Sequence, residues 1–137
     1  MALRRFAQLL LALAISGCKQ ESPIRIRVTP GSSARALALT LQARDSLAEM
    51  RGLRVAWSRL RGSRGRGSQG HILWSIAAAG AHSRKVPRTV VYGSAPSGFV
   101  ASSAEGLAPG WYEIEILRDG PSDIAYFQIH NDGSISQ

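Results

Sequence analysis

Apolar and polar residues alternate along most of this chain. The apolar positions recur with a period of two in the ranges 24–28, 53–57, 72–76, 90–92, 112–116 and 125–129. Because successive side chains of a strand point to opposite faces of a sheet, this period predicts half-buried β-strands. Proline and glycine stand between these segments, for example at 30–31 and 120–121, and they predict tight turns.

The cleanest alternation lies in the range 112–116. Glu113 and Glu115 occupy its polar positions, about 7 Å apart on one side of the predicted strand. That spacing would suit an acid/base pair, whereas the period of two favours a solvated outer face, which is the interpretation we prefer. The range 125–129 is the expected partner strand, because the turn residues 119–121 separate the two segments.

The range 33–51 fits two structures. As a helix it would begin at the capping residue Ser33 and end at Gly52. As a strand it would place alternate leucines on one face, in the sequence Leu37-Ala-Leu-Thr-Leu41. We prefer a strand over about 36–43, followed by a loop or a short helical turn.

Seven or so short strands with frequent turns predict an all-β fold, a single antiparallel β-sandwich. The chain has 137 residues, of which 119 follow Cys18. That length is enough for one domain with its own hydrophobic core.

The first eighteen residues break the alternation. Arg4 and Arg5 precede a largely apolar run over 6–15, and the segment ends in Ile15-Ser16-Gly17-Cys18, which contains the only cysteine of the chain. A membrane-spanning helix needs about 20 apolar residues, so this run is too short for a permanent span. Positive charge followed by a short apolar run is typical of an export signal.

The segment Ile-Ser-Gly-Cys resembles the lipobox of bacterial lipoproteins. The resemblance implies a signal peptide over 1–17 that is removed, and attachment of acyl chains such as palmitate to Cys18. Residues 18–23 would then be the lipidated cysteine and a short tether, and 24–137 would be the β-sandwich domain. Two or more acyl chains hold a protein firmly on a bilayer.

A second resemblance lies near the end of the chain. The segment Leu107-Ala-Pro-Gly-Trp-Tyr-Glu-Ile-Glu-Ile116 is similar to a strand of bacterial Ig-like and prealbumin-like sandwich modules. It implies a Pro-Gly turn that leads into a strand, with the hydroxyl of Tyr112 holding a loop as a tyrosine corner does. This segment and the other glycine, proline and aromatic residues make the chain look like small uncharacterised bacterial lipoproteins. That resemblance brings no known activity.

The chain is basic. Its formal charge of +8 falls to +6 without Arg4 and Arg5. The part RGSRGRGSQG over 61–70 predicts a flexible basic loop between two strands. Guanidinium groups bind phosphate and carboxylate, which makes the arginines in and beside this loop the candidate anion-binding residues: Arg59, Arg61, Arg64 and Arg66. The alternative is a loop kept soluble by its charge, without a ligand.

The three tryptophans divide into two groups. Trp57 and Trp74 share the apolar phase of their predicted strands, which predicts that both belong to the core. Trp111 has the phase opposite to Tyr112, so we expect it to be partly exposed and regard it as the candidate aromatic contact. The alternative for Trp111 is that it covers an edge of the sheet.

Motifs for catalysis are absent from the sequence. His71, His82 and His130 have no second ligand at a metal-binding spacing, and no serine lies in a G-x-S-x-G turn. We therefore predict that the protein is not an enzyme and has no cofactor and no metal site.

These observations favour a lipid-anchored cell-envelope protein with a non-catalytic binding or scaffolding role. By the lipoprotein resemblance, Lys19 in place of an aspartate favours the outer membrane, facing the periplasm. The expected partners are the membrane, through the lipid anchor, and an anionic envelope polymer or lipid; nucleic acid is not expected there. The alternative is an accessory subunit of an envelope or secretion complex that binds another protein through a sheet edge.

Overall fold

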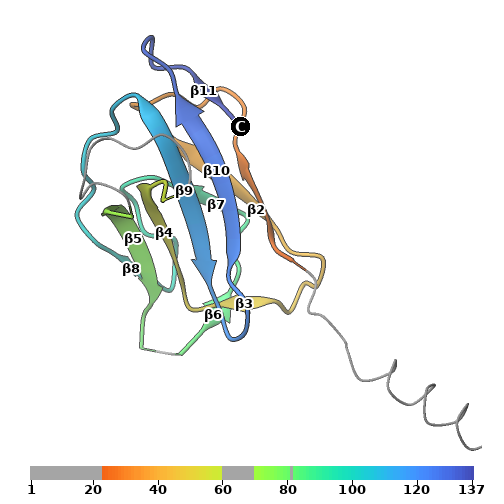
Figure 1. Cartoon of the computed structure of the whole chain (residues 1–137). Helices are drawn as coiled ribbons and strands as arrows, with labels where there is room; N and C mark the ends of the chain where they lie inside the picture. Colours follow the sequence, from red (N-terminus) through yellow and green to blue (C-terminus); the bar gives the residue numbers. More distant parts are fainter. Residues whose placement is uncertain (1–22, 60–69, 81) are drawn as a thin grey trace, which may run out of the picture.

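The computed structural model describes residues 23–59, 70–80 and 82–137. These residues form eleven strands and no helix, and all strand pairings are antiparallel (Figure 1). The strands are β1 (Arg25–Val28), β2 (Ala38–Gln42), β3 (Glu49–Met50), β4 (Gly52–Trp57), β5 (Ile72–Ala78), β6 (Arg84–Lys85), β7 (Thr89–Val91), β8 (Phe99–Ala101), β9 (Gly110–Leu117), β10 (Asp123–Ile129) and β11 (Ile135–Ser136). The prediction of an all-β, antiparallel fold is confirmed for this part of the chain.

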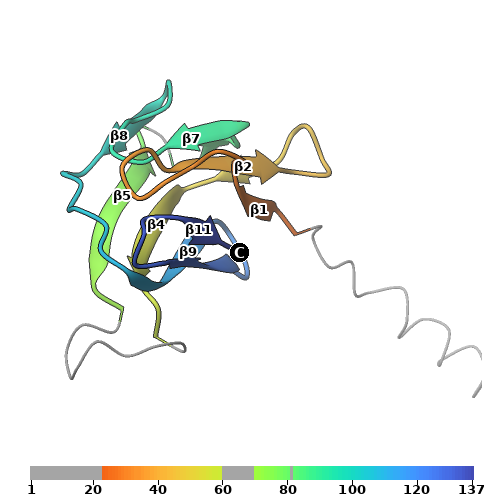
Figure 2. The same ribbon diagram turned by 90° about the horizontal axis from the view of Figure 1, so that it is seen from above.

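The strands form two larger sheets and one small one. The three-stranded sheet has the order β1-β2-β7, and the six-stranded sheet has the order β11-β10-β9-β4-β5-β8. Viewed from above, β2 and β7 lie over β4 and β9, so the two larger sheets form two layers (Figure 2). The two-stranded sheet β3-β6 lies at one end of the domain, next to the β9–β10 turn (Figure 1).

One hydrophobic core lies between the two layers. The three-stranded sheet contributes side chains such as Ile26, Leu39 and Val90, and the six-stranded sheet contributes side chains such as Val55 and Ile114, all in one packed cluster. Each of these residues occupies the apolar phase of its strand, so the period of two determines which side chains enter the core. Burial of this apolar surface is the main favourable contribution to folding.

The range 33–51 contains a strand. Leu37, Leu39 and Leu41 are all buried, which a helix could not achieve because it would turn alternate residues to different faces. The prediction of a strand over about 36–43 is confirmed by β2, and the helical alternative is wrong. β2 pairs with β1 on one side and with β7 on the other, so tertiary pairing outweighs the helix-favouring composition.

The predicted hairpin at the end of the chain is also present. β9 pairs with β10 across the expected turn, and β10 then pairs with the short final strand β11. The short strands β3, β6 and β8 were not predicted, because two or three residues are too few to show a period.

One residue of β5 departs from its predicted phase. The alternation predicted Ile72 on the core face beside Trp74, but Ile72 is exposed and its neighbour Leu73 is buried. The register between β4 and β5 shifts between Val55 and Ala56, where Ile72 pairs. Such an irregularity turns a side chain to the other face, and it cannot be predicted from the sequence of one strand.

Candidate functional site

The structure describes only part of the predicted site. Cys18, Arg61, Arg64 and Arg66 lie outside the described residues, so their roles remain predictions. Arg59 lies two residues after the end of β4, and Trp111 lies in β9. Within the described ranges no helix is long and apolar enough to cross a bilayer.

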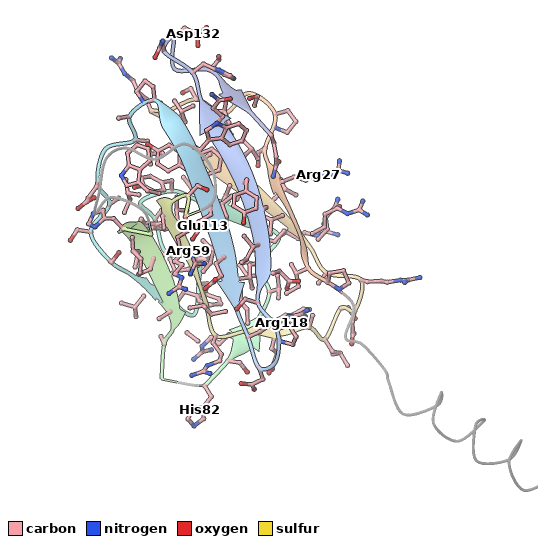
Figure 3. All side chains as sticks on the ribbon, in the orientation of Figure 1. Arg27, Arg59, His82, Glu113, Arg118 and Asp132 are labelled. Atoms are coloured by element: carbon pink, nitrogen blue, oxygen red, sulfur yellow. The ribbon has the colours of Figure 1, made fainter. Side chains whose placement is uncertain are left out.

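Arg59 makes contacts with two carboxylates of β9. Its Nε donates to Oε1 of Glu113 at 2.8 Å, and its backbone N–H donates to the other oxygen of that carboxylate at 3.3 Å. A terminal guanidinium nitrogen lies 3.5 Å from Oε2 of Glu115. The labelled side chains of Arg59 and Glu113 lie together on the six-stranded sheet in Figure 3. Arg59 is therefore neutralised in part by internal carboxylates, and half of its side chain, 51%, is exposed.

The same carboxylates are held by a second arginine. Arg54 pairs in register with Glu115 across β4 and β9, and the guanidinium of Arg54 contacts Oε1 of Glu115. Ala56 lies opposite Glu113 and is itself buried. Its methyl group leaves room above the sheet, so the longer Arg59 side chain can reach over it to Glu113.

The prediction that Glu113 and Glu115 face solvent is wrong. The two residues are only 4% and 6% exposed. Their phase in β9 is the predicted one, away from the core, but the long side chains of Arg54 and Arg59 lie over them. Alternation identifies the face that a side chain occupies and not what covers that face. Buried carboxylates require such partners, since an unpaired buried charge is strongly unfavourable.

Trp111 lies on this same outer face, two residues before Glu113 along β9. It is partly buried, and its backbone carbonyl accepts a hydrogen bond from the N–H of Ser58 at 3.0 Å. The expected partial exposure is confirmed, while the proposed aromatic contact remains a prediction. Trp74 is completely buried, and Trp57 is partly buried and packs against the core, as their phase predicted.

Tyr112 joins the core to the loop before β9. Its ring is stacked between Trp57 and Phe127, with centroid distances of 4.4 Å and 5.0 Å. Its hydroxyl donates to the backbone carbonyl of Ala108 at 2.5 Å. The loop contact that the sequence segment implied for Tyr112 is therefore present.

The histidines lie near the surface and apart from one another. Nε2 of His71 lies 2.8 Å from a carboxylate oxygen of Glu105, and Nε2 of His130 lies 2.8 Å from the hydroxyl of Ser136. Tyr92 donates its hydroxyl to the carbonyl of Glu105, and desolvation, with the Glu105 charge, raises the pKa of Tyr92 to about 12. Among the described side chains, no group of three His, Cys, Asp or Glu residues is placed to hold a metal ion.

The structure reveals a basic surface that the sequence reasoning missed. Arg25 and Arg27 alternate with core residues of β1, so both point away from the core; Figure 3 shows Arg27 directed away from the domain. The ranges 23–44 and 86–92 include all three strands of the three-stranded sheet, and they contain five arginines and no acidic residue. The sequence signal of this surface is the pattern Ile-Arg-Ile-Arg-Val, whose alternation places two arginines on the outer face of a strand.

The basic surface includes a hollow at one corner of the domain. The hollow has a volume of about 370 Å³ and is lined by Pro23, Arg25, Gln42, Ala43 and Arg44. Arg25 and Gln42 are register partners of β1 and β2, which places both on the outer face of the sheet. Two guanidinium groups and one amide, without a carboxylate among the lining residues, suit an anionic group.

No family model matches the chain, and no curated protein or solved structure resembles it significantly.

Proposed function

We propose that this protein is a lipid-anchored component of a bacterial cell envelope that binds anionic envelope material without catalysis. The strongest support is the unbalanced positive charge of the three-stranded sheet, which begins at Arg25, seven residues after Cys18. An anchor at Cys18 would hold this basic surface beside a bilayer, where anionic lipids and polymers are concentrated. The outer membrane, facing the periplasm, is the proposed location.

We also infer that the fold is a β-sandwich of the Ig-like or prealbumin-like type. Two observations support this assignment: the three-stranded and six-stranded sheets share one core, and Tyr112 bonds to a residue four positions earlier, as in a tyrosine corner. The buried glutamates have a structural explanation in their arginine partners, which favours a binding protein over an enzyme.

The lipid anchor is tested by replacing Cys18 with Ser. In cells given labelled palmitate, the wild-type protein is expected to incorporate the label and the Cys18→Ser protein to incorporate none, because the serine hydroxyl replaces the thiol that takes the lipid. Labelled protein is separated by electrophoresis and counted. The matched control is Lys19→Gln, which changes the adjacent residue and should remain labelled. Palmitate on the Cys18→Ser protein, or none on the wild type, would contradict the anchor.

Anion binding by the predicted basic loop is tested by replacing Arg61, Arg64 and Arg66 with Ser. The triple variant should elute from immobilised lipopolysaccharide at a lower salt concentration than the wild type, because exposed charges attract through a screened interaction. The control removes the same charge from Arg51, Arg84 and Lys85, which are exposed residues outside both the loop and the basic surface. Elution at the wild-type salt concentration would remove the loop from the proposed binding site.

The alternative function, a sheet-edge contact with another envelope protein, meets an obstacle at β1. The side-chain amide of Gln137 accepts a hydrogen bond from the N–H of Val28 at 2.8 Å and donates one to the carbonyl of Ile26 at 3.1 Å. These backbone groups are the ones that an added strand would use. The occupied edge of β1 therefore favours the anion-binding function over strand addition at this position.

A further inference from the structure

The basic hollow lies beside a turn that presents an apolar side chain to solvent. The turn over 43–48 follows β2, and its residue Leu47 is 80% exposed, the highest value among the large hydrophobic residues that the structure describes. Oδ1 of Asp45 accepts a hydrogen bond from the N–H of Leu47 at 2.9 Å, which stabilises the turn. Arg44 lines the hollow and belongs to the same turn, so the apolar tip and the guanidinium group are neighbours.

This region is also where the described chain begins. Pro23 lines the hollow together with Arg25 and Arg44, and the turn after β2 and the start of β1 occupy the same corner in both Figure 1 and Figure 2. We call the five residues Pro23, Arg25, Gln42, Arg44 and Leu47 the tether corner. Arg25 lies seven positions after Cys18 in the sequence, and a chain of that length spans at most about 25 Å.

The hollow of the tether corner contains two arginines and no carboxylate among its lining residues. Arg27 lies on the same outer face of β1 as Arg25. On the other side of the turn, a neighbouring hollow is lined by Arg44, Leu47 and Arg118 together with the acidic residues Asp45, Glu49 and Asp119. The carboxylate of Asp45 is turned toward the backbone of its own turn by its bond to Leu47. The hollow therefore complements an anionic group, and the exposed leucine beside it is a side chain that a membrane interface would bury.

We propose that the tether corner docks on the surface of an anionic bilayer. Arg25 and Arg44 bind the phosphate groups of anionic phospholipid headgroups in the hollow, and Leu47 enters the boundary between headgroups and acyl chains. The proposal rests on the proposed lipid anchor at Cys18, which keeps the corner at a high local concentration near the membrane. It adds an orientation: the three-stranded sheet lies toward the membrane, and the far edge of the six-stranded sheet lies away from it.

A fluorescent label at position 47 tests the docking in the acylated protein. Acylation blocks the only native thiol, so the variant Leu47→Cys has a single reactive site for an environment-sensitive fluorophore. The protein is reconstituted into vesicles of phosphatidylcholine with or without phosphatidylglycerol. We expect a blue shift of the emission only in the anionic vesicles. The control label is placed by Val100→Cys in β8, an exposed position on the opposite side of the domain, where no shift is expected (Figure 1).

A pair of charge variants tests the hollow itself. In the labelled protein, Arg25→Gln with Arg44→Gln should lower the ratio of docked to undocked protein on the order of 30-fold, because each arginine near an anionic surface contributes to the attraction. The matched control, Arg35→Gln with Lys85→Gln, removes the same charge from exposed positions outside the hollow. Because screening weakens distant charges, that ratio should fall by about threefold or less.

The results of these experiments distinguish a failure of the docking proposal from a failure of the lipid anchor on which it rests. Equal losses in the two charge variants would show a diffuse attraction and overturn the phosphate site in the hollow. An unshifted label at position 47 in anionic vesicles, or an equal shift at position 100, would overturn the docking while the anchor remains. If a maleimide reacts with Cys18 of the protein purified from membranes, the anchor is absent, and the proposed function fails together with the docking.

Discussion

A protein in which alanine replaces Tyr112 is expected to lose about 3–5 kcal/mol of its unfolding free energy. The ring is completely buried and lies between Trp57 and Phe127 at centroid distances of 4.4 Å and 5.0 Å. Truncation to a methyl group removes both ring contacts and leaves a cavity between two rigid aromatic side chains, which cannot collapse into the space. Denaturant-induced unfolding of the full chain, monitored by tryptophan fluorescence, measures the loss.

The variant Tyr112→Phe separates the ring from the hydroxyl. It keeps the stacked ring and removes only the hydrogen bond to the carbonyl of Ala108, so we expect a loss of about 1 kcal/mol. If Tyr112→Phe were as unstable as Tyr112→Ala, the hydroxyl rather than the stacking would dominate. A loss below about 1 kcal/mol for Tyr112→Ala would contradict the buried stack.

The second large effect is expected from removal of both arginines that contact Glu113 and Glu115. The double variant Arg54→Ala with Arg59→Ala should lose about 3 kcal/mol of unfolding free energy, since it removes the described counter-charges from two buried carboxylates. This expected loss is at the lower end of the range for broken buried ion pairs, because Arg59 is half exposed and solvent partly screens its charge. The same unfolding measurement applies.

Two further variants test whether the loss of stability comes from the buried carboxylates. Arg51→Ala breaks an exposed pair with Asp119 at 3.8 Å, and it should change the stability by less than about 0.5 kcal/mol. Adding Glu113→Gln and Glu115→Gln to the double arginine variant should recover part of the loss, because the amides carry no charge. A double arginine variant as stable as Arg51→Ala would show that the buried carboxylates do not need these partners.

The strands with the clearest alternation could be predicted from the sequence. In β9 the residues Tyr112, Ile114 and Ile116 enter the core as the period of two requires, and β10 pairs with β9 across the predicted turn. The structure of β2 was harder to predict, because its leucine-rich composition also suits a helix. Its pairing with β1 and β7 decided the structure, and such pairing joins residues far apart in the chain.

The candidate site could be predicted only in part. The exposure of Trp111 and the loop contact of Tyr112 followed from local pattern and from the resemblance of the segment around them. The burial of Glu113 and Glu115 could not be predicted. The arginines that cover them come from β4 and from the second residue after it, more than fifty positions earlier in the chain. The tether corner likewise joins Arg25 with Arg44, which the register of β1 and β2 brings together.

The sequence by itself determined which residues form the main strands, which faces they present and how much net positive charge the chain carries, because alternation and composition are local properties. Only the tertiary structure decided the order of strands in the sheets, the turning of Ile72 to the surface and the covering of the glutamates by Arg54 and Arg59. These features depend on non-local pairing, in which segments distant in the chain compete for the same neighbours and the most favourable packing selects one arrangement.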